Sequence, residues 1–231
     1  MTTAESQPVI PAATVVLLRD GSAGLETLML RRDTELAFAG GAWVFPGGRI
    51  DPHDFPSGSV SEDPEALLAA ARTAAGREAM EEAGLEVDPA EMVWFAHWTP
   101  PEGAARRFST WFFMTRAPEG SVVIDDGEIR DHIWIRPADA LRARDAQEID
   151  LIPPTWMTLL RLAELDTVET ALSQARTAKP SVYVTRIELI NDAIAAIWSG
   201  DAAYEDGDVT KPGPRHRLVM LPDGWILERD I

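Results

Sequence analysis

A pair of glycines, followed at a distance by a cluster of glutamates, constrains this chain more than any other feature. Residues 43–49 read Trp-Val-Phe-Pro-Gly-Gly-Arg, and residues 77–85 read Arg-Glu-Ala-Met-Glu-Glu-Ala-Gly-Leu. The first segment predicts a short strand that ends at glycine. The second predicts the last turns of a helix, because Gly84 suits the left-handed residue that closes a helix. A strand, a turn and a helix are therefore expected in this order.

Three carboxylates share one face of the predicted helix. Glu78 and Glu82 are one turn apart, and Glu81 lies beside them. Like charges at this spacing repel by roughly 0.2–0.5 kcal/mol per pair on an exposed helix. Because Mg²⁺ and Mn²⁺ prefer oxygen ligands, the cluster predicts a divalent metal site. The alternative is a solvated acidic stripe in which Arg77 pairs with Glu81.

The first 145 residues alternate between strand and helix patterns. Strands are expected at residues 12–18, 25–31, 43–45, 91–98, 106–115 and 132–135. Asp63 and Pro64 form a helix start, with a capping aspartate and a proline in the first turn, and the alanine-rich helix runs to Ala83. A shorter helix is expected near residue 137. This order favours an α/β fold with a mixed sheet covered on both faces.

The pattern changes in the last third of the chain. Pro153 and Pro154 open an amphipathic helix, for which packing against the sheet is a sufficient explanation. From residue 180 onward the sequence is β-leaning, and a hairpin is expected from residues 217–221 and 225–229 around a Pro-Asp-Gly turn. Residues 187–198 are compatible with a helix or a strand.

Composition and charge exclude several classes of protein. Apolar residues make up 45% of the 231 residues, and no apolar run approaches the roughly 18 residues that span a bilayer. The net charge of −17 opposes binding to nucleic acid or to an anionic membrane. The chain has no cysteine, which excludes disulfides, thiolate nucleophiles and cysteine-based zinc sites. We therefore expect a cytoplasmic protein that binds neither nucleic acid nor membrane.

The glycine turn and the glutamate helix together resemble the signature of the Nudix hydrolases, which ends in Arg-Glu-apolar-x-Glu-Glu-x-Gly-apolar. Ala79 and Leu85 stand at the two apolar positions. The resemblance implies a Nudix-type α/β/α sandwich with a mixed sheet. It places the Nudix domain at residues 8–150 and leaves residues 151–231 as a C-terminal extension, first helical and then β-leaning.

The resemblance also implies metal-dependent hydrolysis of a pyrophosphate linkage, with Mg²⁺ or Mn²⁺ as the cofactor. The expected metal ligands are Glu78, Glu81, Glu82 and the carbonyl of Gly48. Glu81 is either a ligand or the residue that holds a metal-bound water. The general base is open between Glu78 and Glu128, which lies in a loop before the strand at 132–135. Structural residues of the motif would be Gly47, Arg77 and Gly84.

An insertion interrupts the signature. Its usual spacing places the arginine fourteen residues after the leading glycine, whereas Gly48 and Arg77 are 29 positions apart, so that some fifteen residues are inserted. The glutamate that the signature places between them falls on Asp54 when counted forward and on Ala69 when counted backward. Because that glutamate is usually a structural partner, its loss concerns local geometry more than metal binding.

The insertion, together with Phe-Pro-Gly-Gly-Arg-Ile-Asp at residues 45–51, is similar to the branch of organellar coenzyme A diphosphatases. This branch implies hydrolysis of coenzyme A or acyl-coenzyme A to a phosphopantetheine product and adenosine 3′,5′-bisphosphate. The expected substrate-binding residues are Arg49, Arg106, Arg107 and Trp98.

Other functions stay open at this point. ADP-ribose, NADH or another nucleoside diphosphate derivative would use the same motif. A catalytically idle Nudix-fold ligand sensor would need no metal cluster, and the intact glutamates argue against it. A protein-interaction module has no supporting motif. The family resemblance further implies a homodimer.

Overall fold

The computed structural model describes residues 8–36, 39–124 and 127–230, which group by their internal contacts into two compact units. The larger unit comprises residues 11–97 and 110–181. The smaller unit takes residues up to 10, residues 98–109 and the chain from residue 182 onward. The expected boundary between a Nudix domain and a C-terminal extension, at residues 150 and 151, stays a prediction. The helices that follow it belong with the larger unit.

The main sheet has eight strands among the described residues, and six of them form a path in the order β3-β2-β1-β6-β5-β8. On this sheet β4 pairs with β1, and β7 pairs with β2. The strand bounds are β1 (Val9–Gly21), β2 (Gly24–Arg32), β3 (Trp43–Val44), β4 (Gly47–Arg49), β5 (Val93–Thr99), β6 (Arg107–Arg116), β7 (Ile129–Ile135) and β8 (Ser181–Val184).

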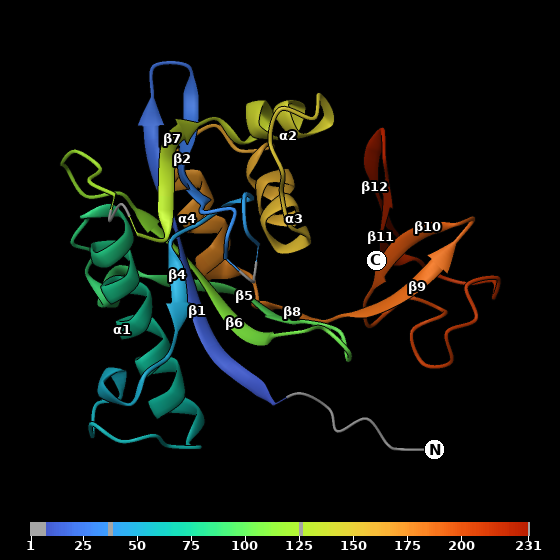
Figure 1. The fold of residues 1–231 in the computed structure, drawn as a ribbon, viewed down its shortest axis with the longest axis horizontal. Coiled ribbons are helices and arrows are strands. Elements are labelled where there is room, and N and C mark those ends of the chain that lie inside the picture. The colour runs from blue at the N-terminus through green and yellow to red at the C-terminus, as the bar shows by residue number, and fades with distance from the viewer. Residues whose placement is uncertain (1–7, 37–38, 125–126, 231) are drawn as a thin grey trace. The chain divides into compact units, whose positions relative to one another are not determined.

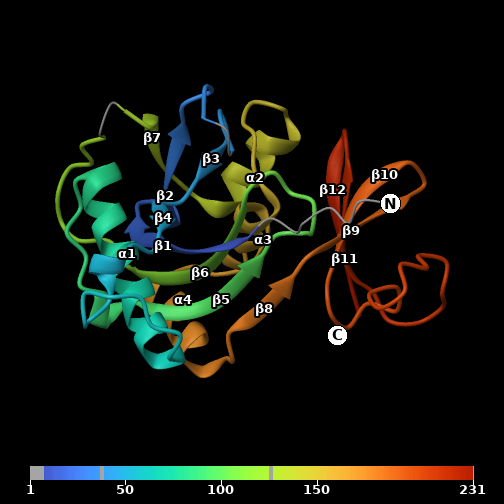
Figure 2. The ribbon, with the colours of Figure 1, turned by 60° about the horizontal axis from the view of Figure 1, so that its bottom comes forward.

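Helices cover both faces of the sheet in the larger unit, with α1 on one side and α2 and α3 on the other (Figures 1 and 2). Their bounds are α1 (Pro64–Ala83), α2 (Pro137–Asp145), α3 (Pro153–Leu162) and α4 (Val168–Thr177), with short 3₁₀ helices η1 (Pro52–Asp54) and η2 (Pro89–Glu91). The expected α/β class with a mixed sheet is confirmed.

Helix α1 is the element that carries the glutamates, and its local sequence explains both of its ends. The side chain of Asp63 accepts a hydrogen bond from the backbone N–H of Ala66, and proline follows as the first helical residue. Gly84 closes the helix in the left-handed conformation, at φ 66°. The predicted start and end of this helix are therefore confirmed.

Alanines let α1 lie close to the sheet. Ala74, Ala75 and Ala79 are fully buried against Val15 of β1 and Phe113 of β6. Because alanine side chains are small, the helix backbone approaches the strands closely, and the carboxylates of its last turns come near the end of β4. The close packing of this helix therefore sets the geometry of the site described below.

The strand expected at residues 43–45 is present as β3, which ends at Val44. A further strand, β4, begins at Gly47, where it pairs antiparallel with β1. Pro46 separates the two strands because it lacks a backbone N–H for a ladder hydrogen bond. The two glycines consequently belong to a strand of their own that faces α1.

The smaller unit contains a four-stranded sheet in the order β12-β11-β10-β9. Its strands are β9 (Arg186–Ile190), β10 (Ala193–Ile197), β11 (His216–Leu221) and β12 (Gly224–Arg229). The hairpin expected around residues 222–224 is confirmed. The segment at 187–198 forms two strands, because Asn191 and Asp192 both adopt positive φ and make a two-residue turn.

A buried ion pair ties the connection between β10 and β11. The carboxylate of Asp201 accepts hydrogen bonds from the guanidinium of Arg217 and from the backbone N–H groups of Ala203 and His216. Nearby, the ring of Trp98 stacks on Tyr183 with centroids 3.8 Å apart. These contacts give the smaller unit an interior of its own.

Among the described residues, no helix is both long enough and apolar enough to cross a membrane.

Candidate active site

The site lies where β4 faces the last turns of α1. The carboxylate of Glu82 is buried there, and its Oε2 accepts a hydrogen bond of 2.9 Å from the backbone N–H of Gly47. Its other oxygen, Oε1, lies 3.7 Å from Nη1 of Arg32. Glu82 therefore connects the glycine strand to the glutamate helix.

Gly48 lies directly against the carboxylate of Glu78. A Cβ atom built on Gly48 would overlap Oε1 of Glu78, so that a side chain there would push this carboxylate aside. Gly47 is equally confined, because its Cβ would lie 2.5 Å from the backbone oxygen of Ala13 on the paired strand β1. The two glycines thus allow carboxylates and backbone to share a space that any side chain would fill.

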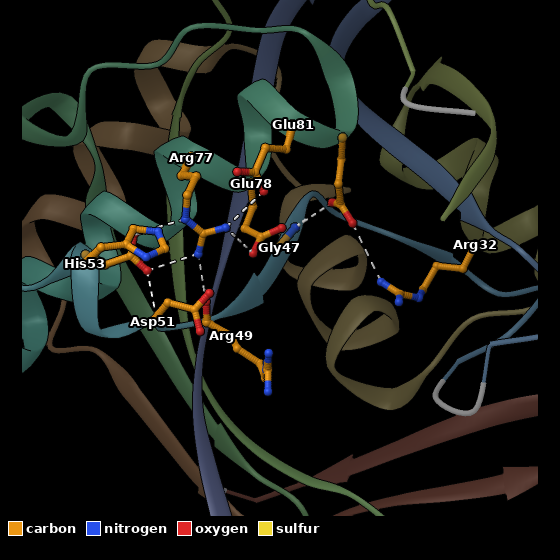
Figure 3. A network of polar contacts seen from close by, with 10 residues as sticks. Arg32, Gly47, Arg49, Asp51, His53, Arg77, Glu78 and Glu81 are labelled. Atoms are coloured by element: carbon orange, nitrogen blue, oxygen red, sulfur yellow. Dashed lines mark hydrogen bonds and ion pairs between the residues drawn. The ribbon is translucent and has the colours of Figure 1, made fainter. Parts of the chain in front are cut away.

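Arg77 organises the outer edge of this cluster (Figure 3). Its guanidinium makes five hydrogen bonds, a number that equals its N–H donors. The acceptors are both carboxylate oxygens of Asp54, Oε1 of Glu78, Oε2 of Glu81 and the backbone oxygen of Arg49. The predicted structural role of Arg77 agrees with these contacts.

Asp54 is the partner that the interrupted signature left open. Nε and Nη2 of Arg77 each lie 3.0 Å from one of its carboxylate oxygens. The same carboxylate also accepts a hydrogen bond from the backbone N–H of Asp51, which fixes it on the short helix η1. Counting forward from Gly48 therefore finds the acidic partner, whereas Ala69 lies inside α1 and supplies no acid.

The segment between Asp54 and Arg77 consists of a loop at residues 55–63 and most of α1. The length of this segment does not separate its two ends, because Asp54 is bonded to Arg77 in a bidentate manner.

Burial and like charges perturb both central glutamates. Burial raises the pKa of Glu82 to about 8; the hydrogen bond from Gly47 and the charge of Arg32 oppose this rise, while the charges of Glu78 and Glu128 reinforce it. Burial also raises the pKa of Glu78, against the stabilising hydrogen bond from Arg77. Strongly perturbed carboxylates of this kind are concentrated at functional sites.

The remaining acids of the predicted site have different surroundings. The side chain of Glu81 is 58% exposed and bonds to Arg77. Glu128, just before β7, is also 58% exposed, and its Oε2 lies 2.9 Å from Nη2 of Arg32. Sequence reasoning had no signal for Arg32, which enters from the end of β2 and was missed.

The predicted substrate-binding residues divide between the two units. Arg49 follows the glycines on β4, and its side chain is exposed. Arg106, Arg107 and Trp98 belong to the smaller unit. Nη2 of Arg107 donates a 3.3 Å hydrogen bond to the backbone oxygen of Pro100, and Trp98 is 4% exposed. Their roles toward a substrate stay predictions.

Glu78 and Glu82 fit a divalent cation by their chemistry. No three acidic or histidine side chains converge on one point within the described residues, and Arg77 hydrogen-bonds both Glu78 and Glu81. Glu82 is buried and Glu78 partly buried, the charge of Glu78 raises the pKa of Glu82, and Glu78 lies against a glycine without a Cβ atom. A hard cation favours such oxygen donors and would relieve their repulsion.

The chain matches known proteins in family and in fold. The family model described as NUDIX domain matches residues 9–154. Among solved structures, the chain is similar to a NUDIX hydrolase from Alicyclobacillus acidocaldarius, with 23% identity over 72% of this chain and 96% of that chain and a TM-score of 0.62. It is also similar to a MutT NUDIX hydrolase from Burkholderia pseudomallei, with 17% identity over 68% of this chain and 99% of that one and a TM-score of 0.50. At these identities the likeness shows the fold.

Proposed function

The chain belongs to the Nudix family, whose model covers residues 9–154, and it is a Nudix pyrophosphohydrolase; on this premise we propose that it cleaves the pyrophosphate linkage of coenzyme A or acyl-coenzyme A. The observation that carries the proposed site is the approach of buried Glu82 and partly buried Glu78 to the glycines of β4. The coenzyme A assignment is supported by the insertion and by the resemblance of residues 45–51 to the coenzyme A diphosphatases.

Nudix hydrolases generally use divalent metal ions, and we propose Mg²⁺ or Mn²⁺ here. Such an ion supplies charge neutralisation on phosphate oxygens and lowers the pKa of bound water. Glu78 and Glu82 would be its side-chain ligands, with the carbonyl of Gly48. Glu81 would be a further ligand or would hold a metal-bound water.

Arg77 and Gly47 would keep the two ligands in place before an ion arrives. The guanidinium of Arg77 holds Glu78 from one side, and the backbone N–H of Gly47 holds Glu82 from the other. Because these donors are fixed by the fold, little rearrangement would be needed on binding, and preorganised sites catalyse better for this reason.

Glu128 is our choice for the general base, ahead of Glu78. Glu78 is engaged by Arg77 and lies against Gly48, which suits a ligand. Glu128 is more exposed than Glu78. After the larger effect of burial, the charge of Glu128 also raises the pKa of both Glu78 and Glu82, so the carboxylate of Glu128 lies near theirs. A carboxylate at the edge of a metal site is able to accept a proton from an attacking water.

Arginine side chains would bind the phosphates of the substrate, because the guanidinium fork matches phosphate oxygens. Arg49 is the candidate next to the glycines, since its side chain is exposed and only its backbone oxygen is used by Arg77. Arg106, Arg107 and Trp98, which belong to the smaller unit, stay predicted substrate-binding residues on the sequence pattern alone.

The test is cleavage of a panel of coenzyme A, acetyl-coenzyme A, ADP-ribose and NADH, each with Mg²⁺ and with Mn²⁺, followed by chromatography. We expect cleavage of the coenzyme A compounds, lost in Glu82→Gln. Glu86→Gln is the matched control, because Glu86 is exposed and lies four residues further along the chain.

Each result of the panel leads to a distinct conclusion. Cleavage of ADP-ribose or NADH alone would overturn the coenzyme A assignment and keep the metal-dependent chemistry. No cleavage, together with no change of melting temperature on adding Mn²⁺, would favour the idle ligand sensor.

The same resemblance supports a homodimer, which light scattering after size exclusion would test. A chain without cysteine also suits the reducing cytoplasm, which is our proposal for its location.

A further inference from the structure

The end of β2 makes an unusual set of contacts with the segment that carries Glu128. The register between β2 and β7 shifts between Arg31 and Arg32, so that Arg31 opposes Asp131 and Arg32 opposes Ile129. Such an irregularity re-aims the side chains beside it, and it is common next to active sites. Here it places the guanidinium of Arg32 between Glu82 and Glu128.

Arg32 is itself held firmly. Its backbone N–H donates to the oxygen of Ala42, and its backbone oxygen accepts from Gly41. Its side chain is only 16% exposed, although it carries a charge. Figure 3 shows Arg32 on the side of Gly47 away from Arg77, so that two arginines flank the glutamates. A restrained arginine in this place is able to orient the acids that it touches.

Glu128 is attached to β2 at two points. Its side chain bonds to Arg32 at 2.9 Å, and its backbone oxygen accepts a hydrogen bond of 2.8 Å from the N–H of Asp33. Two residues further on, Arg130 pairs with the carboxylate of Asp33. Opposite charges therefore alternate across the two segments, which fixes their register as well as their distance.

Arg32 contacts Glu128 more closely than Glu82. The separation from Glu82 is 3.7 Å, which is an ion pair beyond hydrogen-bond distance, whereas the separation from Glu128 is 2.9 Å. An ion pair with a partner as exposed as Glu128 contributes little to stability. The ion pair would instead fix the position of Glu128, because a catalytic carboxylate must lie within a fraction of an ångström of its productive position.

We propose that Arg32 is a positioning residue, which holds Glu128 beside the glutamates of α1 and acts on the reaction through it. This inference rests on the proposed function, because Glu128 is the proposed general base. It goes further by assigning a role to an arginine outside the motif. Asp33 and Arg130 support the same arrangement from the backbone side.

The kinetic test is a double-mutant cycle with the panel substrate that the wild type cleaves. Arg32→Gln is expected to lower kcat about tenfold or more, with KM changed less than twofold. The double variant Arg32→Gln/Glu128→Gln should be no slower than Glu128→Gln alone, because both changes remove the same function. Arg32→Lys should recover part of kcat, since a lysine keeps the charge but has no planar fork.

Arg31→Gln is the matched control. Arg31 is the neighbouring arginine on the same strand, is 46% exposed and pairs with Asp131 at 3.7 Å. Its kcat and KM should stay at the wild-type values. A rise of KM in Arg32→Gln at unchanged kcat, with losses that add to those of Glu128→Gln, would overturn the proposal and assign Arg32 to substrate binding.

Hydrogen exchange tests the positioning without any turnover. Amides of residues 127–131 should exchange faster in Arg32→Gln than in the wild type or in Arg31→Gln, because Glu128 loses one of its attachments. Equal exchange in all three proteins would overturn the proposal. If the wild type cleaves no compound of the panel, the proposed function fails, and the exchange measurement still decides whether Arg32 positions this segment.

Discussion

Glu82 and Asp201 are buried to the same extent, at 5% and 6% exposure, yet their surroundings are opposite. Asp201 receives four hydrogen bonds, two of them from Arg217, and these outweigh the effect of burial and lower its pKa to about 2. Glu82 receives one hydrogen bond from Gly47, and burial raises its pKa to about 8.

The difference is the one expected between a structural carboxylate and the metal ligand that we propose Glu82 to be. A buried carboxylate that accepts hydrogen bonds from several donors is stable in its ionised form. A buried carboxylate with few donors is unstable in that form, and its pKa rises. The smaller unit therefore uses its acid to hold a connection between strands. In the larger unit, Glu82 has Arg32 only at ion-pair distance, 3.7 Å, and the cation that we propose would add positive charge beside it. This contrast leads to four predictions.

Glu82→Gln should produce the largest change, which is in activity. We expect kcat to fall by at least about 100-fold, because changes even to the groups that support a metal ligand cost 10- to 100-fold. Without metal, the variant should be no less stable than the wild type at pH 8, since a buried charge has been removed. Kinetic assays and urea unfolding measure the two effects. A variant that stays active would show that Glu82 is a second structural acid.

Asp201→Asn should produce the largest change in stability. It leaves the guanidinium of Arg217 buried with only the more distant Glu228, at 3.9 Å, as a charged partner, and breaking a buried pair in this way costs about 3–5 kcal/mol. The measurement is urea unfolding followed by the fluorescence of Trp198, which lies in the same unit.

Asp206→Asn is the control for this experiment. Asp206 pairs with Lys211 at 2.9 Å, but both side chains are about half exposed, at 51% and 46%. Its loss should cost less than about 1 kcal/mol. Similar losses in the two variants would mean that burial does not distinguish the two pairs.

The dependence of stability on pH should have opposite signs for the two acids. The pKa of Glu82 is about 8 in the folded chain and 4.5 as its ordinary value. Between pH 4.5 and pH 8 the unfolded chain therefore binds fewer protons at this group than the folded chain, so that the stability of the fold falls as pH rises. The pKa of Asp201 is about 2 in the folded chain and 3.8 as its ordinary value, so that between these values the stability of the fold rises with pH.

Unfolding experiments without metal at pH 5, 6.5 and 8 would measure the first of these effects. We expect a loss of a few kcal/mol for the wild type and a flatter profile for Glu82→Gln. Mn²⁺ at 100 times its dissociation constant should restore about 2.7 kcal/mol at pH 8. Equal slopes in wild type and variant would show that Glu82 is not the group that titrates.

The motif predicted only those neighbours of the candidate site that spacing along one helix or strand brings together. Helical periodicity alone places Glu78 and Glu82 on one face, and the structure brings both to the glycines of β4. Arg32 could not be found in this way, since it comes from a different strand and owes its direction to a shift of register. Contacts between distant segments depend on pairing that no short pattern contains.

The smaller unit shows the same limit for the fold. The hairpin at its end was predicted because a Pro-Asp-Gly turn marks it, whereas residues 187–198 had no glycine or proline at the turn. Asn191 and Asp192 make that turn with positive φ, which these two residue types tolerate without any distinctive pattern. The turn became visible only with the strand pairing.

Asp54→Asn should have the smallest effect, and it bears most directly on the comparison. Asp54–Arg77 is a bidentate pair like Asp201–Arg217, but Arg77 is 20% exposed against 3% for Arg217, and it also holds Glu78 and Glu81. Removing the charge of Asp54 should let Arg77 turn toward the glutamates, so we expect kcat to fall about tenfold, or about 1.4 kcal/mol, with some loss of Mn²⁺ affinity.

Asp63→Asn is the control, because asparagine also caps a helix and this position lies at the far end of α1. Steady-state kinetics and Mn²⁺ titration of both variants distinguish two roles for Asp54. A loss of stability in Asp54→Asn at unchanged kcat would place this pair with Asp201–Arg217 as a structural tie. A loss of kcat with little loss of stability would show that one kind of ion pair holds a loop in the smaller unit and orients ligands in the larger one.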